Sequence, residues 1–269
     1  MQPYGMAPSI KLGVLGGALA LGLSVAAFAQ NVKLDVIYVP TPFEVVERML
    51  NMAEVKKGEF LIDLGSGDGR IPVTAAKKFG ARGFGVDINP ERVREANENA
   101  KKEGVADQVE FRVQNLYETD FSKADVLSMY LLTEINLKLR PRILSELRPG
   151  ARVVSHAFEM GDWKPDQQDK LGTRDVYLWI VPAKLQGRWQ VEDGETSFAL
   201  NIEQNYQEFT GNAVVNGQTA PIRNPQLRGD QVRFTLDIAG RQREYLGTVK
   251  GNAIEATGQG TPWKARRSG

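Results

Sequence analysis

The stretch that decides the fold reads FLIDLGSGDGR over residues 60–70 and, after a helical run, GFGVD over residues 83–87. An apolar strand leads into a glycine turn and a helix, and a second apolar strand ends in the carboxylate of Asp87. The glycines allow a tight turn and a close approach of ligand to backbone, while the helix start presents free N–H groups. Asp87 lies about 20 residues beyond the glycines, where a carboxylate can accept both ribose hydroxyls. The stretch therefore predicts half of a nucleotide-binding α/β unit.

The spacing of the glycines separates two kinds of nucleotide site. The dinucleotide fingerprint requires its third glycine at position 70, which Arg70 occupies. Glycine stands instead at positions 65, 67 and 69, shortly after Asp63. This pattern resembles motif I of the class I, seven-β-strand, S-adenosylmethionine-dependent methyltransferases. The resemblance covers about residues 35–181 and implies an α/β fold with a Rossmann-like seven-stranded methyltransferase sheet.

The resemblance also implies how the cofactor, S-adenosyl-L-methionine, is held. Asp63 is expected to orient the turn and the methionyl ammonium, the turn to give backbone contacts, and Asp87 to hold the ribose. A glycine turn in an α/β domain without a ligand is the alternative. The cofactor-binding residues expected around the motif are Asp63, Gly65, Ser66, Gly67, Asp87 and Ile88.

Two further segments add cofactor-binding candidates. Residues 109–113 alternate as a strand, and the turn after the corresponding strand in class I methyltransferases carries an acidic or amide residue at the adenine amine. Asn115 is the candidate, with Gln114 beside it, although an ordinary turn asparagine explains the residue nearly as well. Before motif I, Pro-Thr-Pro at residues 40–42 resembles a loop of a lysine-methyltransferase branch, in which it closes over the methionine end of the cofactor. Thr41 is therefore a candidate, and a plain surface turn is the alternative.

The methyl acceptor is less well defined by the sequence. The lysine-methyltransferase branch modifies membrane proteins, including the ATP synthase c-subunit and the adenine nucleotide translocase. Its resemblance extends to residues 158–165, after a fifth strand expected at residues 152–156. No Asn/Asp-Pro-Pro-Tyr follows the fourth strand, which is expected at residues 124–132, and this argues against an adenine or glutamine target. A helix is expected from residue 134 to 147, with Pro141 starting a second piece. The weak candidates for a proton acceptor are Glu134, His156, Glu159 and Asp162, and a structural histidine is the alternative for His156.

The two ends of the chain have their own patterns. Residues 1–29 hold an apolar run from Leu12 to Phe28 and an Ala-Phe-Ala pattern, which predict a signal peptide and an exported, periplasmic protein. An uncleaved inner-membrane anchor is the alternative. Residues 30–183 are expected to form the methyltransferase domain, and residues 184–269 a small all-β barrel or sandwich of about seven or eight strands. Gly-x-Trp at 187–189 and Arg266 near the end resemble the floor of a lipocalin barrel.

Composition removes several classes of function. A net charge of +1 gives no polybasic footprint, so nucleic acid is not an expected partner. The chain has no cysteine and one histidine, so disulfides, a metal site and a Ser-His triad are not expected. We therefore expect an enzyme that N-methylates a protein lysine. A small-molecule methyltransferase and an exported noncatalytic binding protein with a vestigial cofactor site are the alternatives.

Overall fold

The computed structural model describes residues 1, 38–194, 196–238, 240–258 and 262–268. The predicted signal peptide or anchor lies outside the described residues, apart from Met1. Leu34–Gly269 form one compact unit that contains two separate sheets. Within the described part of the chain, no helix is long and apolar enough to cross a membrane.

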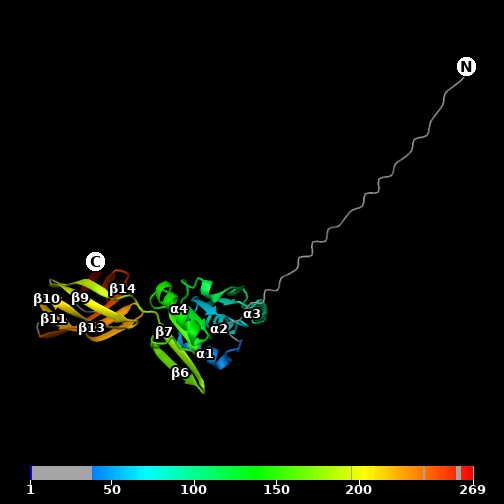
Figure 1. Cartoon of the computed structure of the whole chain (residues 1–269), viewed down its shortest axis with the longest axis horizontal. Helices are drawn as coiled ribbons and strands as arrows, with labels where there is room; N and C mark the ends of the chain where they lie inside the picture. Colours follow the sequence, from blue (N-terminus) through cyan, green and yellow to red (C-terminus); the bar gives the residue numbers. More distant parts are fainter. Residues whose placement is uncertain (2–37, 195, 239, 259–261, 269) are drawn as a thin grey trace. The chain divides into compact units, whose positions relative to one another are not determined.

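The first sheet has seven strands in the order β3-β2-β1-β4-β5-β7-β6 (Figure 1). The first five run parallel, and β7 is antiparallel to β5 and to β6. This arrangement confirms the predicted seven-stranded Rossmann-like sheet. Its strands are β1 Phe60–Leu64, β2 Arg82–Asp87, β3 Val109–Val113, β4 Val126–Met129, β5 Arg152–His156, β6 Gln167–Leu171 and β7 Arg174–Ile180.

In the part of the chain that the structure describes, four α-helices and one short 3₁₀-helix accompany this sheet. They are α1 Phe43–Met52, α2 Arg70–Phe79, α3 Pro90–Lys102, η1 Leu116–Glu118 and α4 Thr133–Glu146. Asn89 caps α3 by accepting the amide of Glu91, as its Asn-Pro-Glu start predicts. The expected break at Pro141 is wrong, because α4 continues through it. The buried side chains of Leu139 and Ile143 on either side hold both halves of the helix on the same core.

The carboxyl ends of the parallel strands lie along one edge of the sheet, where ligands bind in open α/β folds. Helix packing leaves this edge to the loops that follow the strands. The turn after β1, the ends of β2 and β3, and the loops after β4 and β5 therefore meet there.

The second sheet has nine strands in the order β11-β10-β9-β8-β16-β15-β14-β13-β12. All neighbouring strands are antiparallel, and the amide of Ile222, between β11 and β12, donates to Gly211 O of β10. The sheet is thus a nearly closed barrel, which confirms the predicted all-β fold. Its strands are β8 Gly187–Asp193, β9 Thr196–Asn205, β10 Glu208–Val215, β11 Gln218–Pro221, β12 Arg223–Arg228, β13 Gln231–Ile238, β14 Arg241–Lys250, β15 Ala253–Ala256 and β16 Trp263–Arg267.

Two details of the barrel differ from expectation. Nine strands replace seven or eight, because β12 is almost entirely exposed and shows no apolar alternation. The arginine on the barrel tryptophan is Arg267, whose Cζ lies 4.3 Å from the centre of the Trp189 ring, and not Arg266. Strand parity explains this: Trp263 and Ala265 face inward, so Arg266 faces solvent. The boundary between the two predicted domains at residues 183 and 184 stays a prediction.

Candidate active site

The glycine turn after β1 is held by the neighbouring strand β2. Gly65, Gly67 and Gly69 all have positive φ, between 51° and 76°. The amides of Gly65 and Ser66 donate to Val86 O, and the amide of Gly67 donates to Asp87 Oδ2 at 2.9 Å. The turn is therefore oriented by Val86 and Asp87. The Asp63 carboxylate accepts the Ser128 hydroxyl, and its expected role in orienting the turn stays a prediction.

Asp63 is a buried carboxylate with one hydrogen-bond donor. Its side chain is 2% exposed, and Oδ1 accepts the Ser128 hydroxyl at 2.7 Å. Burial raises its pKa to about 7; the Ser128 bond opposes this, and the negative charges of Asp87 and Asp68 add to it. A cation placed against this carboxylate would stabilise its ionised form. The site thus suits an ammonium group such as that of the methionyl moiety.

Ser66 and Asp87 give a second and third indication that the turn accepts a polar ligand. The Ser66 hydroxyl is buried and has no hydrogen-bond partner among the residues that the structure describes. Each oxygen of Asp87 accepts one amide, from Gly67 and from Asn89 at 2.9 Å, and retains a lone pair for a further donor. A buried hydroxyl without a partner is costly unless a ligand satisfies it. These residues therefore fit the amino acid and ribose of S-adenosylmethionine.

The expected adenine side lies at the ends of β2 and β3. The side chain of Ile88 is 37% exposed beside Asp87, where it could pack on a planar base. The amide of Gln114 donates to Asp87 O, which ties the two strand ends together. Asn115 caps η1 by accepting the amide of Tyr117, and its Nδ2 lies 3.5 Å from Glu118. The capping bond fits the ordinary turn asparagine, and the adenine role of Asn115 stays a prediction.

The Pro-Thr-Pro loop is held at the same edge from two sides. The Thr41 hydroxyl lies 3.1 Å from His156 Nδ1 at the end of β5, and its carbonyl accepts Arg70 Nη1 at 2.7 Å. Arg70 is in turn paired with Asp68. The loop therefore bridges the start of α2 and the end of β5, and this places Thr41 over the edge where the turn lies.

Several residues of this edge were missed in the sequence. Ser128 pairs in register with Asp63 across β1 and β4, so the strand order of the fold could have indicated it. Tyr38 lies against the turn, since a Cβ at Gly67 would collide with its ring. Tyr130, directly after β4, had no signal beyond its position at a strand end.

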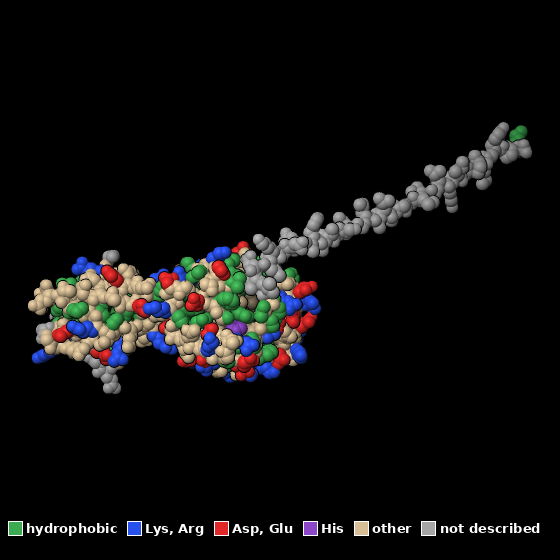
Figure 2. Space-filling model, turned by 60° about the horizontal axis from the view of Figure 1, so that its bottom comes forward, with side chains coloured by type: hydrophobic (Ala, Val, Ile, Leu, Met, Phe, Trp, Pro, Cys, Tyr) green, Lys and Arg blue, Asp and Glu red, His purple; other side chains and the backbone are tan. Residues whose placement is uncertain are grey.

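An aromatic group surrounds His156 at the ends of β4 and β5. The rings of Tyr130 and His156 are centred 3.9 Å apart, and Phe158 stacks on Tyr130 at 5.9 Å. Figure 2 shows the single histidine, in purple, among hydrophobic side chains on one face. Burial, followed by the charge of Arg174, lowers the pKa of His156 to about 4. His156 is therefore neutral near pH 7 and a poor proton acceptor, which favours the structural alternative.

The three carboxylate candidates for proton transfer are exposed. Glu134 lies in the first turn of α4, and Glu159 lies in the loop after β5. Asp162 pairs with Arg140 at 2.5 Å and accepts the Tyr206 hydroxyl at 3.1 Å. The bond from Arg140 lowers the pKa of Asp162, so its carboxylate is a weak base. The geometry thus assigns no proton acceptor among them.

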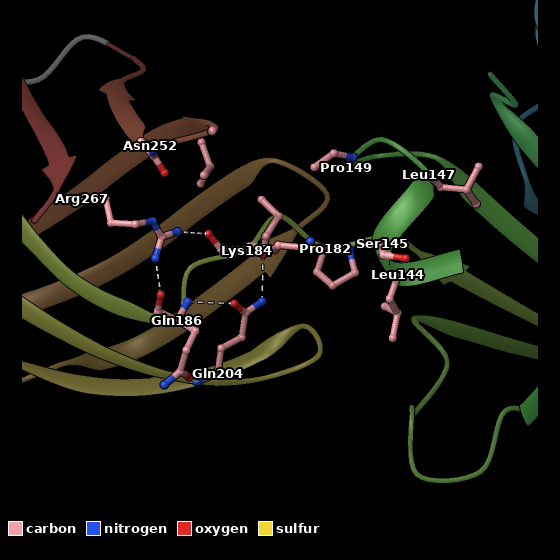
Figure 3. Close-up of a pocket in the computed structure, with 13 residues that line it drawn as sticks. Leu144, Ser145, Leu147, Pro149, Pro182, Lys184, Gln186, Gln204, Asn252 and Arg267 are labelled. Atoms are coloured by element: carbon pink, nitrogen blue, oxygen red, sulfur yellow. Dashed lines mark hydrogen bonds between the residues drawn. The ribbon is translucent and has the colours of Figure 1, made fainter. Parts of the chain in front are cut away.

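A cleft of about 590 Å³ lies beside the segment that joins the two sheets, and its lining contains no residue of the glycine turn (Figure 3). Two of its polar side chains, Gln204 and Arg267, bind the backbone of residues 183–186, which joins the two sheets. Gln204 Oε1 accepts the amides of Leu185 and Gln186, and the Arg267 guanidinium donates to Lys184 O and Gln186 O. Since these groups are engaged, the cleft serves the connection between the sheets.

Comparisons with known proteins agree with the geometry of the sheet edge. The model of a family described as the ANTKMT methyltransferase domain matches residues 63–167. A protein-lysine N-methyltransferase of Saccharolobus islandicus (strain REY15A) is 46% identical over 149 residues, which cover 54% of this chain and 92% of that protein. The ATP synthase c-subunit lysine N-methyltransferase of Homo sapiens is 31% identical over 194 residues, covering 71% and 82%.

A solved structure is similar as well. It is described as an RNA methyltransferase from Salinibacter ruber in complex with S-adenosyl-L-homocysteine, the demethylated product of the cofactor. It is 51% identical, has a TM-score of 0.54, and the match covers 55% of this chain and 96% of that chain. The fold, the turn and these relatives agree with one another. The chain is an S-adenosylmethionine-dependent methyltransferase and belongs to the family of the protein-lysine N-methyltransferases.

Proposed function

We propose that this enzyme N-methylates lysine side chains of protein substrates at the edge between β1, β4 and β5. The observation that carries the proposal is the pairing of two sites there. Asp63, Ser66 and Asp87 offer polar groups suited to the cofactor, and Tyr130 and Phe158 offer an aromatic wall beside them. The identity to the protein-lysine N-methyltransferase of Saccharolobus islandicus supports this choice of acceptor.

Cofactor binding follows from the three polar residues. When bound, S-adenosylmethionine supplies a methyl group on a sulfonium, which transfers in line to a neutral amine. The ionised Asp63 would face the methionyl ammonium, the Ser66 hydroxyl would bond a polar group nearby, and Asp87 would accept the ribose hydroxyls. Thr41, held by Arg70 and His156, would cover the methionyl end.

The acceptor lysine must lose its proton before it attacks. An aromatic wall desolvates an ammonium group and so lowers its pKa, which favours release of the proton to water. His156 holds Thr41 in this scheme and takes no proton, since its pKa is about 4.

RNA is a second candidate acceptor, because the similar solved structure is described as an RNA methyltransferase. The net charge of +1 and the sequence Tyr130-Leu131-Leu132 after β4, in place of Asn/Asp-Pro-Pro-Tyr, favour protein. A small-molecule amine is the third. These acceptors differ in chemistry, and one labelling experiment separates them.

The test uses the full chain with trideuteromethyl-labelled S-adenosylmethionine. Parallel reactions contain nuclease-treated protein extract, total RNA, or a mixture of small amines, and mass spectrometry locates the label. We expect label on lysine Nζ in the protein reaction and its loss with Asp63→Asn. Label on nucleosides or small amines, with none on lysine, would contradict the proposal.

We also propose that residues 1–29 direct the chain out of the cytoplasm or anchor it at the inner membrane. The apolar run and the Ala-Phe-Ala pattern support this. Cleavage would part the enzyme from a cofactor made in the cytosol, whereas an anchor would leave the two together. N-terminal sequencing and fractionation of the native protein decide between them. A full-length chain in the soluble cytosolic fraction would contradict both.

A further inference from the structure

The loop after β5 connects the aromatic wall to the barrel. This loop, residues 157–166, begins beside His156, where Phe158 stacks on Tyr130. The carbonyl of Phe158 accepts the Ser155 hydroxyl at 2.7 Å and Asn136 Nδ2 at 3.2 Å. Its first half is therefore fixed to β5 and to the start of α4.

The second half of the loop is held by the turn between β9 and β10. Trp163 is fully buried, and its indole N–H donates to Gln207 Oε1 at 3.0 Å. Gln207 Nε2 donates in return to Lys164 O at 2.8 Å. The Trp163 carbonyl accepts Trp179 Nε1 of β7 at 2.7 Å. One barrel glutamine thus satisfies two neighbouring groups of the loop that would otherwise lose their partners.

Tyr206, beside Gln207, adds a second set of contacts. Its ring stacks on Trp163 with the centres 5.9 Å apart, and the Arg140 guanidinium lies 5.5 Å from its centre. Its hydroxyl donates to Asp162, which is also paired with Arg140. Arg140 of α4 further donates to Met160 O at 2.7 Å. The middle of the loop therefore lies between α4 and the barrel turn.

We propose that the β9–β10 turn, through Tyr206 and Gln207, is a positioning element that fixes the loop after β5 and with it the acceptor wall at Phe158. The inference rests on the proposed function, since it concerns how that site receives the acceptor. Only five positions separate Phe158 from Trp163, and both ends of that segment are hydrogen-bonded. We therefore expect loosening at Trp163 to reach Phe158 along this short segment, against the bonds that Ser155 and Asn136 make to the Phe158 carbonyl.

The similar solved structure from Salinibacter ruber matches only part of the present chain. Its match covers 96% of its own chain but 55% of this one, so it leaves almost nothing to correspond to the barrel. The solved chain therefore holds a similar methyltransferase fold in about half the length of the present chain. In the present chain Trp163 has its indole partner on the barrel turn, so the acceptor wall depends on the added module.

The test compares Gln207→Ala with wild type in the full chain. The control is Gln218→Ala, which removes an exposed glutamine from β11, a strand that pairs with β10. The first readout is amide hydrogen exchange of residues 157–166 without ligand, which reports local opening. We expect exchange at least about tenfold faster in Gln207→Ala and unchanged in Gln218→Ala. Unchanged exchange in Gln207→Ala would overturn the proposal.

Two further readouts tie the loop to the acceptor. With poly-L-lysine as acceptor, Gln207→Ala should raise KM several-fold, while the Kd for S-adenosyl-L-homocysteine stays the same. Tyr206→Phe keeps the ring that stacks on Trp163. Its amide exchange rate in residues 157–166 and its KM should therefore lie closer to the wild-type values than those of Tyr206→Ala. A looser loop with an unchanged KM would overturn the acceptor role. If wild type methylates no lysine, the proposed function fails, and the exchange result still decides whether the turn holds the loop.

Discussion

Two buried aspartates, one in each sheet, are treated in opposite ways. Asp63 at the end of β1 has a serine hydroxyl as its donor and a pKa raised to about 7. Asp193 at the end of β8 accepts the Tyr245 hydroxyl at 2.8 Å and is paired with Arg243. Both side chains are almost completely removed from solvent. The barrel aspartate has a cation within the chain, and the aspartate of the α/β sheet has none among the groups that bond to it.

This difference indicates that Asp63, and not Asp193, is the aspartate that binds a ligand. Burying a carboxylate is costly unless a cation or strong donors compensate it. In the barrel Arg243 and the Tyr245 hydroxyl supply this compensation, and the rings of Phe234, Tyr245 and Trp263 pack on one another in the same core. At the edge of the α/β sheet the cost of burying the ionised Asp63 carboxylate is not offset by a cation of the described residues. The buried Ser66 hydroxyl adds a further cost. Strain of this kind is typical of binding sites.

The largest expected effect comes from Asp63→Asn. Its folded pKa of about 7 exceeds the ordinary 3.8, so the folded state binds the extra proton. The free energy of unfolding of the ligand-free protein should therefore fall as the pH rises from about 4 to 7, by at most about 4 kcal/mol. Asparagine carries no charge and removes the cost of burying one. Its amide N–H needs a new acceptor, which offsets part of this gain, so we expect the ligand-free protein to be stabilised by about 1–2 kcal/mol at pH 8.

The same substitution should weaken S-adenosyl-L-homocysteine binding at least about a hundredfold, since the ligand ammonium loses a buried partner. Calorimetric titration and urea unfolding measure the two effects. Loss of both stability and affinity would mean that Asp63 is structural, and the contrast with Asp193 would disappear.

Asp87→Ala should have the next largest effect. A charge-assisted bond is worth about 1.5–3 kcal/mol, so the net loss of even one bond to the ribose should lower affinity at least about tenfold. Asp87 also holds the turn through Gly67, so 2′- and 3′-deoxy analogues of the ligand are needed. If the analogues bind wild type as well as the parent compound does, the ribose assignment is wrong.

A pH titration of ligand affinity should show a graded change of about tenfold for the first pH unit below the pKa of Asp63. Below pH 7 the free enzyme holds Asp63 increasingly protonated, so affinity should fall by about tenfold for each pH unit. Asp87→Asn should move the midpoint to lower pH, because the Asp87 charge is among the causes of the raised pKa. The titration would cover about pH 5.5 to 8, and a ligand affinity that does not change over this range would contradict the raised pKa of Asp63.

Much of the α/β sheet could be predicted from the sequence because its signals are local. The glycine turn, the helix caps and the strand ends are set by neighbouring residues, and the seven strands follow from them. The partner of Asp63 could not be predicted in this way, since Ser128 meets it only through the pairing of β1 with β4. The same holds for Thr41 and His156, which lie far apart in the sequence.

The barrel was predicted less completely for a related reason. Its inward-facing positions alternate clearly in β13 and β14, but β12 carries little apolar signal. Contacts across the two sheets, such as Trp163 with Gln207, join polar groups on exposed turns. Nothing in the residues around a turn indicates which distant group its glutamine will meet.

The last prediction concerns Tyr245→Phe, which should leave cofactor affinity within about twofold of wild type, as expected for distant sites. Phenylalanine keeps the ring that stacks on Phe234 at 5.0 Å but removes the hydroxyl that donates to Asp193. Burial and Asp193 raise the pKa of Tyr245, so this hydroxyl is a donor at every accessible pH. Losing a bond to a charged group should lower the free energy of unfolding by about 1.5–3 kcal/mol. Urea unfolding and ligand titration of the same sample test both parts. A matching loss of affinity would show that the compensated aspartate of the barrel and the uncompensated one of the sheet are coupled, and their separation into structural and ligand-binding roles would have to be abandoned.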